Sequence, residues 1–182
     1  MPVLQQRDRE AVLQRFRTEL KRDVKIELYT QIDMGLYIPG RGCRYCGPTQ
    51  ELLEELSALS PKIRLEVVAF YRNQEQATDL GIERIPALTV GNGGNGNARF
   101  FGMPSGFEFT ALLDTIVGAS DKRSSLQLET RRQLKSLTDD VHIQVFVTPG
   151  CQYSPGLARL THAMAIESPR VTADVIEVQE FP

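Results

Sequence analysis

The chain has 182 residues, of which 41% are hydrophobic and 24% are charged, and its formal net charge is −2. These values are ordinary for a globular protein with a buried core, and the weak charge argues against nucleic acid or an anionic membrane as a partner, because both attract strongly basic surfaces. No apolar run approaches the ~18 residues of a membrane span, and the charged N-terminus lacks the apolar stretch of a secretory signal. We therefore expect a cytoplasmic protein, in which a close cysteine pair is more often catalytic or metal-binding than structural.

The first half of the chain predicts alternating helices and strands. Apolar residues at helical spacing predict a helix over about residues 6–21, and the run 24–30 predicts a strand. A loop rich in glycine then leads to Cys43, and an amphipathic helix follows Cys46. The next strand is predicted at 64–70, and the crossover helix between the two strands favours their parallel pairing.

A hairpin and a further helix complete this half. A short helix around 74–80 precedes two predicted strands, 87–90 and 98–102, which are joined by a loop of glycine and asparagine. Ser105 and Glu108 have the spacing of a capping box, which predicts that a helix begins there. The order α-β-α-β-α-β-β-α indicates a compact α/β sandwich.

The second half repeats part of the first. The turns after two predicted strands are C-R-Y-C-G-P and C-Q-Y-S-P-G. Glu66 lies 23 residues after Cys43, and Asp174 lies 23 residues after Cys151, each within an apolar strand. We interpret this match as an internal duplication.

The duplication predicts three segments. Residues 1–119 form a complete unit with the CxxC pair, residues 120–138 a linker helix, and residues 139–182 a partial second unit. Because two strands and one helix bury little core by themselves, the partial unit either packs on the first or lacks part of its sequence. Its unpaired strand edge would favour a homodimer.

The cysteines at the first turn suit dithiol–disulfide chemistry. A helix N-terminus favours an anion, so we expect Cys43 to be the nucleophilic thiolate and Cys46, about one turn deeper, to be the resolving thiol. Arg44 between them adds a positive charge. The alternative is a zinc ligand pair, for which the remaining candidate ligands are Cys151, His142 and His162.

Ile85 and Pro86 precede the strand predicted at 87–90. A proline in this position is either a cis-proline that fixes a tight turn or a plain loop proline that starts a strand. The residues by themselves leave both alternatives open.

Three motifs resemble those of the thioredoxin and glutaredoxin superfamily: CRYC before a helix, IPA before a strand, and FFGMPSGFEF leading into a helix. The segment FVTPGCQYSPGLARLTHAMAIE is similar to the second unit of the protein disulfide oxidoreductases, which have two thioredoxin-like units. The resemblance implies a thioredoxin-like α/β fold, with a mixed central sheet flanked by helices and a second, partial unit.

The resemblance also implies a function. It implies dithiol–disulfide exchange on protein substrates, through a redox-active disulfide between Cys43 and Cys46 and without a bound cofactor or metal. Reducing equivalents would come from a flavoprotein reductase that uses NADPH. Pro86 matches the cis-proline of the family, and Gly102 matches a glycine that keeps the approach to the cysteines open.

Other positions are assigned with their alternatives. We expect Arg44, Tyr45 and Ile85 to contact substrate. Glu66 is either a buried proton relay or a solvent-facing strand residue. The loop 31–42 forms either an apolar lip for substrates or a longer first strand with a bend.

The second turn departs from the family pattern. Ser154 replaces a cysteine, so Cys151 cannot close a disulfide within its own turn and is either a vestigial site or a monothiol. Two further functions stay open for the whole chain, a glutathione-dependent glutaredoxin and a redox-sensing binding module.

Overall fold

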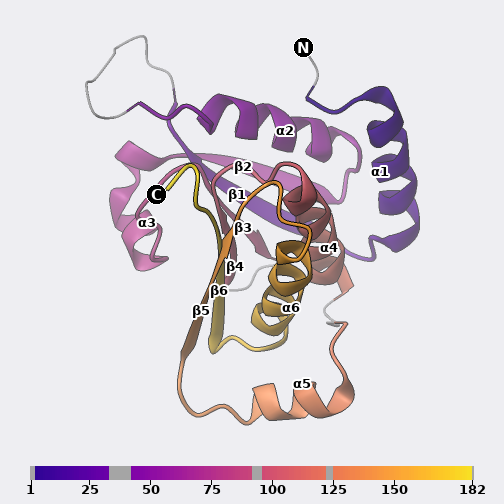
Figure 1. Cartoon of the computed structure of the whole chain (residues 1–182), viewed down its shortest axis with the longest axis vertical. Coiled ribbons are helices and arrows are strands. Elements are labelled where there is room, and N and C mark those ends of the chain that lie inside the picture. The colour runs from indigo at the N-terminus through magenta and orange to yellow at the C-terminus, as the bar shows by residue number, and fades with distance from the viewer. Residues whose placement is uncertain (1–2, 33–41, 92–95, 122–124, 182) are drawn as a thin grey trace.

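The computed structural model of the protein describes residues 3–32, 42–91, 96–121 and 125–181. One six-stranded sheet runs through this part of the chain, in the order β2-β1-β3-β4-β6-β5, with helices on both faces (Figure 1). The strands are β1 (Val24–Thr30), β2 (Ile63–Ala69), β3 (Ala87–Gly91), β4 (Ala98–Phe101), β5 (Val141–Val147) and β6 (Val171–Glu177). The helices are α1 (Gln6–Glu19), α2 (Cys46–Ala58), α3 (Gln74–Asp79), α4 (Phe107–Asp121), α5 (Leu128–Lys135) and α6 (Ser154–Glu167), with a 3₁₀ turn at Phe70–Arg72. The predicted α/β class is confirmed.

Two pairings among the first four strands, the parallel β1–β2 pair and the β3–β4 hairpin, are as the sequence predicts. β1 is parallel to β2, with Val24 opposite Ile63, and antiparallel to β3, with Tyr29 opposite Ala87. β3 and β4 form the expected hairpin. β1 is an inner strand of this unit. From Val24 to Leu28 its apolar residues face the core while Lys25 and Glu27 lie on the other face, and burial on both faces begins at Tyr29 and Thr30.

The two faces of the sheet carry different helices. Phe16, Leu53 and Leu112 bring α1, α2 and α4 onto one face, together with Ile26 of the sheet. The opposite face holds α3 and the segment that follows it, packed around the buried Tyr29 (Figure 1). Successive strand residues point to opposite faces, so both clusters are anchored on the same strand.

The second half extends the same sheet. β6 is parallel to β4, with Ala98 opposite Ala173, and β5 is parallel to β6. Helix α6 lies against α4 on the face that α2 also covers (Figure 1). The partial unit therefore packs on the first unit, whereas its boundaries at residues 119 and 138 stay predictions.

The predicted capping box at the start of α4 is wrong. The Ser105 N–H donates to the Met103 carbonyl instead of to a carboxylate. The Glu108 side chain turns away from its own helix, and its Oε1 accepts a hydrogen bond of 2.6 Å from the Ser154 hydroxyl of α6. A contact between distant helices has replaced the local cap.

Candidate active site

Cys43 and Cys46 are joined by a disulfide, with their Cα atoms 5.5 Å apart. Cys43 is partly exposed, whereas Cys46 is buried with 3% of its surface accessible. α2 begins at Cys46, so Cys43 lies just before the first helical turn. An exposed sulfur joined to a buried one is the arrangement that an attacking and a resolving thiol require.

Gln31 contacts both cysteines. Its side-chain oxygen accepts a hydrogen bond of 3.0 Å from the Cys43 N–H, and its own N–H lies 3.5 Å from the Cys46 sulfur. Sequence reasoning missed this residue. The available signal was its place directly after β1, the strand that leads into the cysteine turn.

The Ile85–Pro86 peptide bond is cis, which confirms the cis-proline alternative. The Cys43 sulfur lies 3.7 Å from the Ile85 carbonyl oxygen. The β1–β3 register explains this contact, because it places Ala87 opposite Tyr29 at the end of β1 that precedes the cysteines. The backbone of Ile85 thus lies beside the outer sulfur, while its role in substrate contact stays a prediction.

Gly102 adjoins the cis-proline, and its surroundings give a steric reason for a glycine at this position. Its N–H donates to the Pro86 carbonyl at 2.9 Å, and its φ is +97°. A Cβ at this position would lie 2.8 Å from Cβ of Glu177 and 3.1 Å from Cδ of Glu180. The glycine therefore makes room for the turn that follows β6, while the expectation that it keeps the approach to the cysteines open stays a prediction.

Glu66 is an exposed residue of the edge strand β2, with 54% of its side chain accessible. Its carboxylate pairs with Lys25 at 2.7 Å. A proton relay beside the cysteines would need a buried carboxyl group, and Glu66 is exposed. The relay is therefore replaced by the alternative of a solvent-facing residue.

Arg44 and Tyr45 lie in the turn between the cysteines. Arg44 is exposed, and its guanidinium carbon is 5.6 Å from the centre of the Tyr45 ring. Their contact with substrate stays a prediction. The predicted apolar lip falls on residues 33–41, which lie outside the described residues.

Cys151 is a free, partly exposed thiol in the turn before α6. Hydrogen bonds from the Tyr153 backbone, the Ser154 backbone and the Ser154 hydroxyl lower the pKa of this thiol, and the nearby Glu108 charge opposes them. Ser154 itself is buried. Its assignment as a vestigial or a monothiol site stays a prediction.

The candidate zinc ligands have other partners. Nε2 of His142 lies 2.6 Å from Asp174, and the described residues contain no group of three or more His, Cys, Asp or Glu that could hold a metal ion. Burial lowers the pKa of His162 to about 4, so its ring is neutral at pH 7. The ring lies 2.9 Å from the Thr115 hydroxyl through Nδ1 and 3.1 Å from the Arg99 carbonyl through Nε2.

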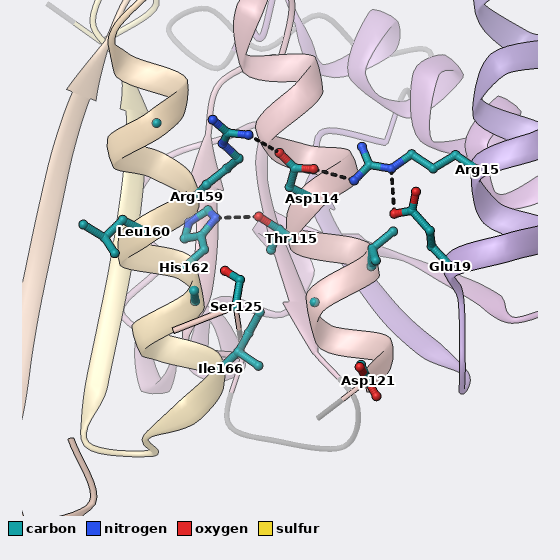
Figure 2. A pocket seen from close by; sticks show the side chains of 14 residues that line it. Arg15, Glu19, Asp114, Thr115, Asp121, Ser125, Arg159, Leu160, His162 and Ile166 are labelled. Carbon is teal, nitrogen blue, oxygen red and sulfur yellow. Dashed lines mark hydrogen bonds and ion pairs between the residues drawn. The ribbon is translucent and has the colours of Figure 1, made fainter. Parts of the chain in front are cut away.

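A cavity of about 670 Å³ lies beside His162, between α1, α4 and α6. Figure 2 shows Asp114 between two arginines, with Arg15 at 2.5 Å and Arg159 at 3.1 Å. The described residues that line this cavity include no cysteine. Asp114 of α4 thus pairs with Arg15 of α1 and Arg159 of α6, so these ion pairs connect three helices.

No family model matches the chain. Over 133 residues the chain is 26% identical to an alkyl hydroperoxide reductase subunit of Staphylococcus aureus, and over 131 residues it is 23% identical to an NADH dehydrogenase of Ferdinandcohnia aciditolerans. These matches cover 72% and 71% of this chain, but 24% and 23% of those proteins. The chain thus spans about a quarter of the length of these curated relatives.

Two solved structures are similar over nearly the whole chain. A protein disulfide oxidoreductase of Aeropyrum pernix superposes with a TM-score of 0.86 and 25% identity, over 98% of this chain and 76% of that one. The alkyl hydroperoxide reductase protein AhpF of Enterococcus faecalis superposes with a TM-score of 0.83 and 21% identity, over 98% of this chain and 82% of that one.

In the part of this chain that the structure describes, no helix is long and apolar enough to cross a membrane.

Proposed function

We propose that this chain, which belongs to the thioredoxin superfamily and has its fold, is a thiol–disulfide oxidoreductase that exchanges disulfides with protein substrates. The observation that carries the proposal is the Cys43–Cys46 disulfide, with its outer sulfur 3.7 Å from the Ile85 carbonyl before a cis-proline. The likeness to the protein disulfide oxidoreductase of Aeropyrum pernix supports the same activity.

The geometry supports a two-step exchange. In the reduced form, the Cys43 thiolate attacks one sulfur of a substrate disulfide, the substrate S–S bond breaks, and a mixed disulfide forms. The Cys46 thiolate then attacks the Cys43 sulfur, which closes the disulfide and releases the substrate as a dithiol. The Ile85 backbone would hold an extended substrate segment beside Cys43. Gln31 would keep the two cysteines in position relative to each other through its contacts with both.

We further propose that a flavoprotein reductase with NADPH returns the disulfide to the dithiol, and that the protein works in the cytoplasm. The similarity to the alkyl hydroperoxide reductase of Staphylococcus aureus supports a place in a chain of dithiol exchanges. In that arrangement, this chain binds no cofactor and passes two electrons between protein thiols.

The test is the reduction of insulin disulfides by dithiothreitol, with the Cys151→Ala protein as reference so that only the CxxC pair can cycle. We expect Cys43→Ser to abolish catalysis and Cys46→Ala to accumulate a mixed disulfide, visible by mass spectrometry. Retained turnover by Cys43→Ser would overturn the assignment. Dependence on glutathione would favour the glutaredoxin alternative, and stoichiometric oxidation without turnover would favour the redox-sensing module.

A further inference from the structure

The second turn holds an ionisable group that the proposed function does not use. Glu108 is 2% exposed, and among the described residues its Oε2 has no hydrogen-bond partner. Its Oε1 contacts the Ser154 hydroxyl at 2.6 Å, and Ser154 Oγ is also 3.1 Å from the Cys151 carbonyl oxygen. A buried carboxyl group with an unpartnered oxygen is costly to keep, so its position beside a thiol calls for an explanation.

A protonated, neutral Glu108 would lower the cost of burying this carboxyl group. Burial raises the pKa of Glu108, although the Ser154 hydrogen bond acts in the opposite direction. When Glu108 is protonated, its O–H can donate to Ser154 Oγ, which frees the Ser154 hydroxyl hydrogen from Glu108. That hydroxyl is one of the groups whose hydrogen bonds lower the pKa of the Cys151 thiol. The three groups then form one chain of donors that ends on the thiolate.

We propose that Cys151, Ser154 and Glu108 form a second thiol–disulfide site, in which Cys151 forms a mixed disulfide with a polypeptide disulfide and Glu108 supplies a proton through Ser154. The Cys151 thiolate attacks one sulfur of the external disulfide, and that S–S bond breaks. The departing thiolate takes the proton that Ser154 relays from Glu108. Cys151 is oxidised, and the external disulfide becomes one thiol and one half of the mixed disulfide.

Ser154 makes this site chemically different from the Cys43–Cys46 site. Ser154 stands where a resolving cysteine would stand, so the mixed disulfide persists until an external thiol attacks it. The Cys43–Cys46 pair is too far away to resolve it. β1 and β5 run in the same direction and are four strand spacings apart in the sheet, which is about 19 Å.

The surroundings favour a polypeptide over a small charged disulfide. Large apolar side chains next to this turn are exposed: Tyr153 and Leu157 on the α6 side, and Phe107, whose N–H contacts the Pro149 carbonyl of the turn. Such side chains can pack against apolar neighbours of a substrate cysteine, whereas glutathione carries charged groups that they would not bind.

The test separates proton transfer from thiol reactivity. In the oxidised protein the Cys43–Cys46 pair is closed, so Cys151 is the thiol that reacts. The result therefore does not depend on whether the function proposed above is correct. We compare its alkylation by iodoacetamide, which needs no proton for a departing thiolate, with its exchange with the disulfide dimer of a Leu-Cys-Leu peptide. Each reaction is followed by mass spectrometry, and alkylation is repeated at alkaline pH, where the thiol is fully ionised.

We expect Glu108→Gln and Ser154→Ala to slow the exchange at least about tenfold, and to leave alkylation at alkaline pH within about twofold of the wild-type rate. Thr161→Ala, which removes another buried hydroxyl of α6, is the matched control and should change neither rate. Equal loss of both reactions, or no loss of exchange, would overturn the relay. Faster exchange with oxidised glutathione than with the peptide would overturn the substrate class.

Discussion

At the residue scale, the first site depends on side chains that lie near one another only after folding. Gln31 follows β1, Cys43 precedes α2, and Ile85 precedes β3. Their contacts are 3.0 Å between the Cys43 N–H and the Gln31 amide oxygen, and 3.7 Å between the Cys43 sulfur and the Ile85 carbonyl. The position of the outer cysteine is therefore set from two other parts of the chain.

Gln31 offers a sharp test of this positioning. Gln31→Ala removes the acceptor of the Cys43 N–H, and one such hydrogen bond contributes about 1 kcal/mol. We expect kcat/KM for insulin reduction to fall about fivefold. The free energy of unfolding, measured with urea, should fall by about 1 kcal/mol or less. Gln31→Glu keeps an acceptor but adds a negative charge, so it should raise the pKa of the Cys43 thiol, measured from the pH dependence of alkylation. An unchanged kcat/KM in Gln31→Ala would remove Gln31 from the site.

At the element scale, α6 is held to the sheet by a neutral histidine. His162 is fully buried, and it contacts the Arg99 carbonyl of β4. Its ring packs edge-on against the Phe100 ring, with 4.5 Å between the ring centroids. The same ring contacts Thr115 of α4. One side chain thus connects two helices and a strand, and burial keeps it neutral at pH 7.

This contact predicts an acid-sensitive fold. The pKa of His162 falls from 6.5 to about 4 in the folded state, so the unfolded chain binds an additional proton between these pH values. The free energy of unfolding should therefore decrease as the pH falls from 6.5 to 4, by up to about 3 kcal/mol from this residue. Urea unfolding of the wild type and of His162→Gln, whose amide does not titrate, measures the difference. An identical slope in both proteins over this range would contradict the prediction.

At the scale of the whole molecule, a buried ion pair joins the two halves. Arg99 of β4 and Asp174 of β6 are adjacent in the sheet, and Arg99 Nε lies 2.5 Å from Asp174 Oδ1. Arg99 also bonds the Leu80 carbonyl, and Asp174 also contacts His142. The pair forms at the strand junction where the duplicated segment continues the sheet of the first unit.

Removing one partner should therefore weaken the whole chain. Arg99→Met leaves the Asp174 carboxylate buried near a single histidine, and we expect a loss of about 3–5 kcal/mol in the free energy of unfolding. Adding Asp174→Leu removes the uncompensated charge and should restore most of that loss. Circular dichroism during urea unfolding measures both variants. A double variant no more stable than Arg99→Met alone would show that the charge is not the cause.

Local patterns in the sequence were sufficient for much of the fold. Strand alternation and helix periodicity predicted the helices and strands of the first half, and the repeated Cys-X-Tyr turn predicted that the second half resembles the first. The same patterns failed where a distant contact competed with a local one. Glu108 has the spacing of a capping residue, yet it bonds Ser154 of a different helix.

The sequence by itself therefore determined the α/β class, the cysteine pair and the turn in which it lies, because each depends on residues a few positions apart. The tertiary structure alone decided that Gln31 contacts both cysteines, that Glu66 faces solvent, and that a buried carboxyl group lies behind Cys151. Those features depend on strand register and helix packing, which bring together residues that no local spacing relates.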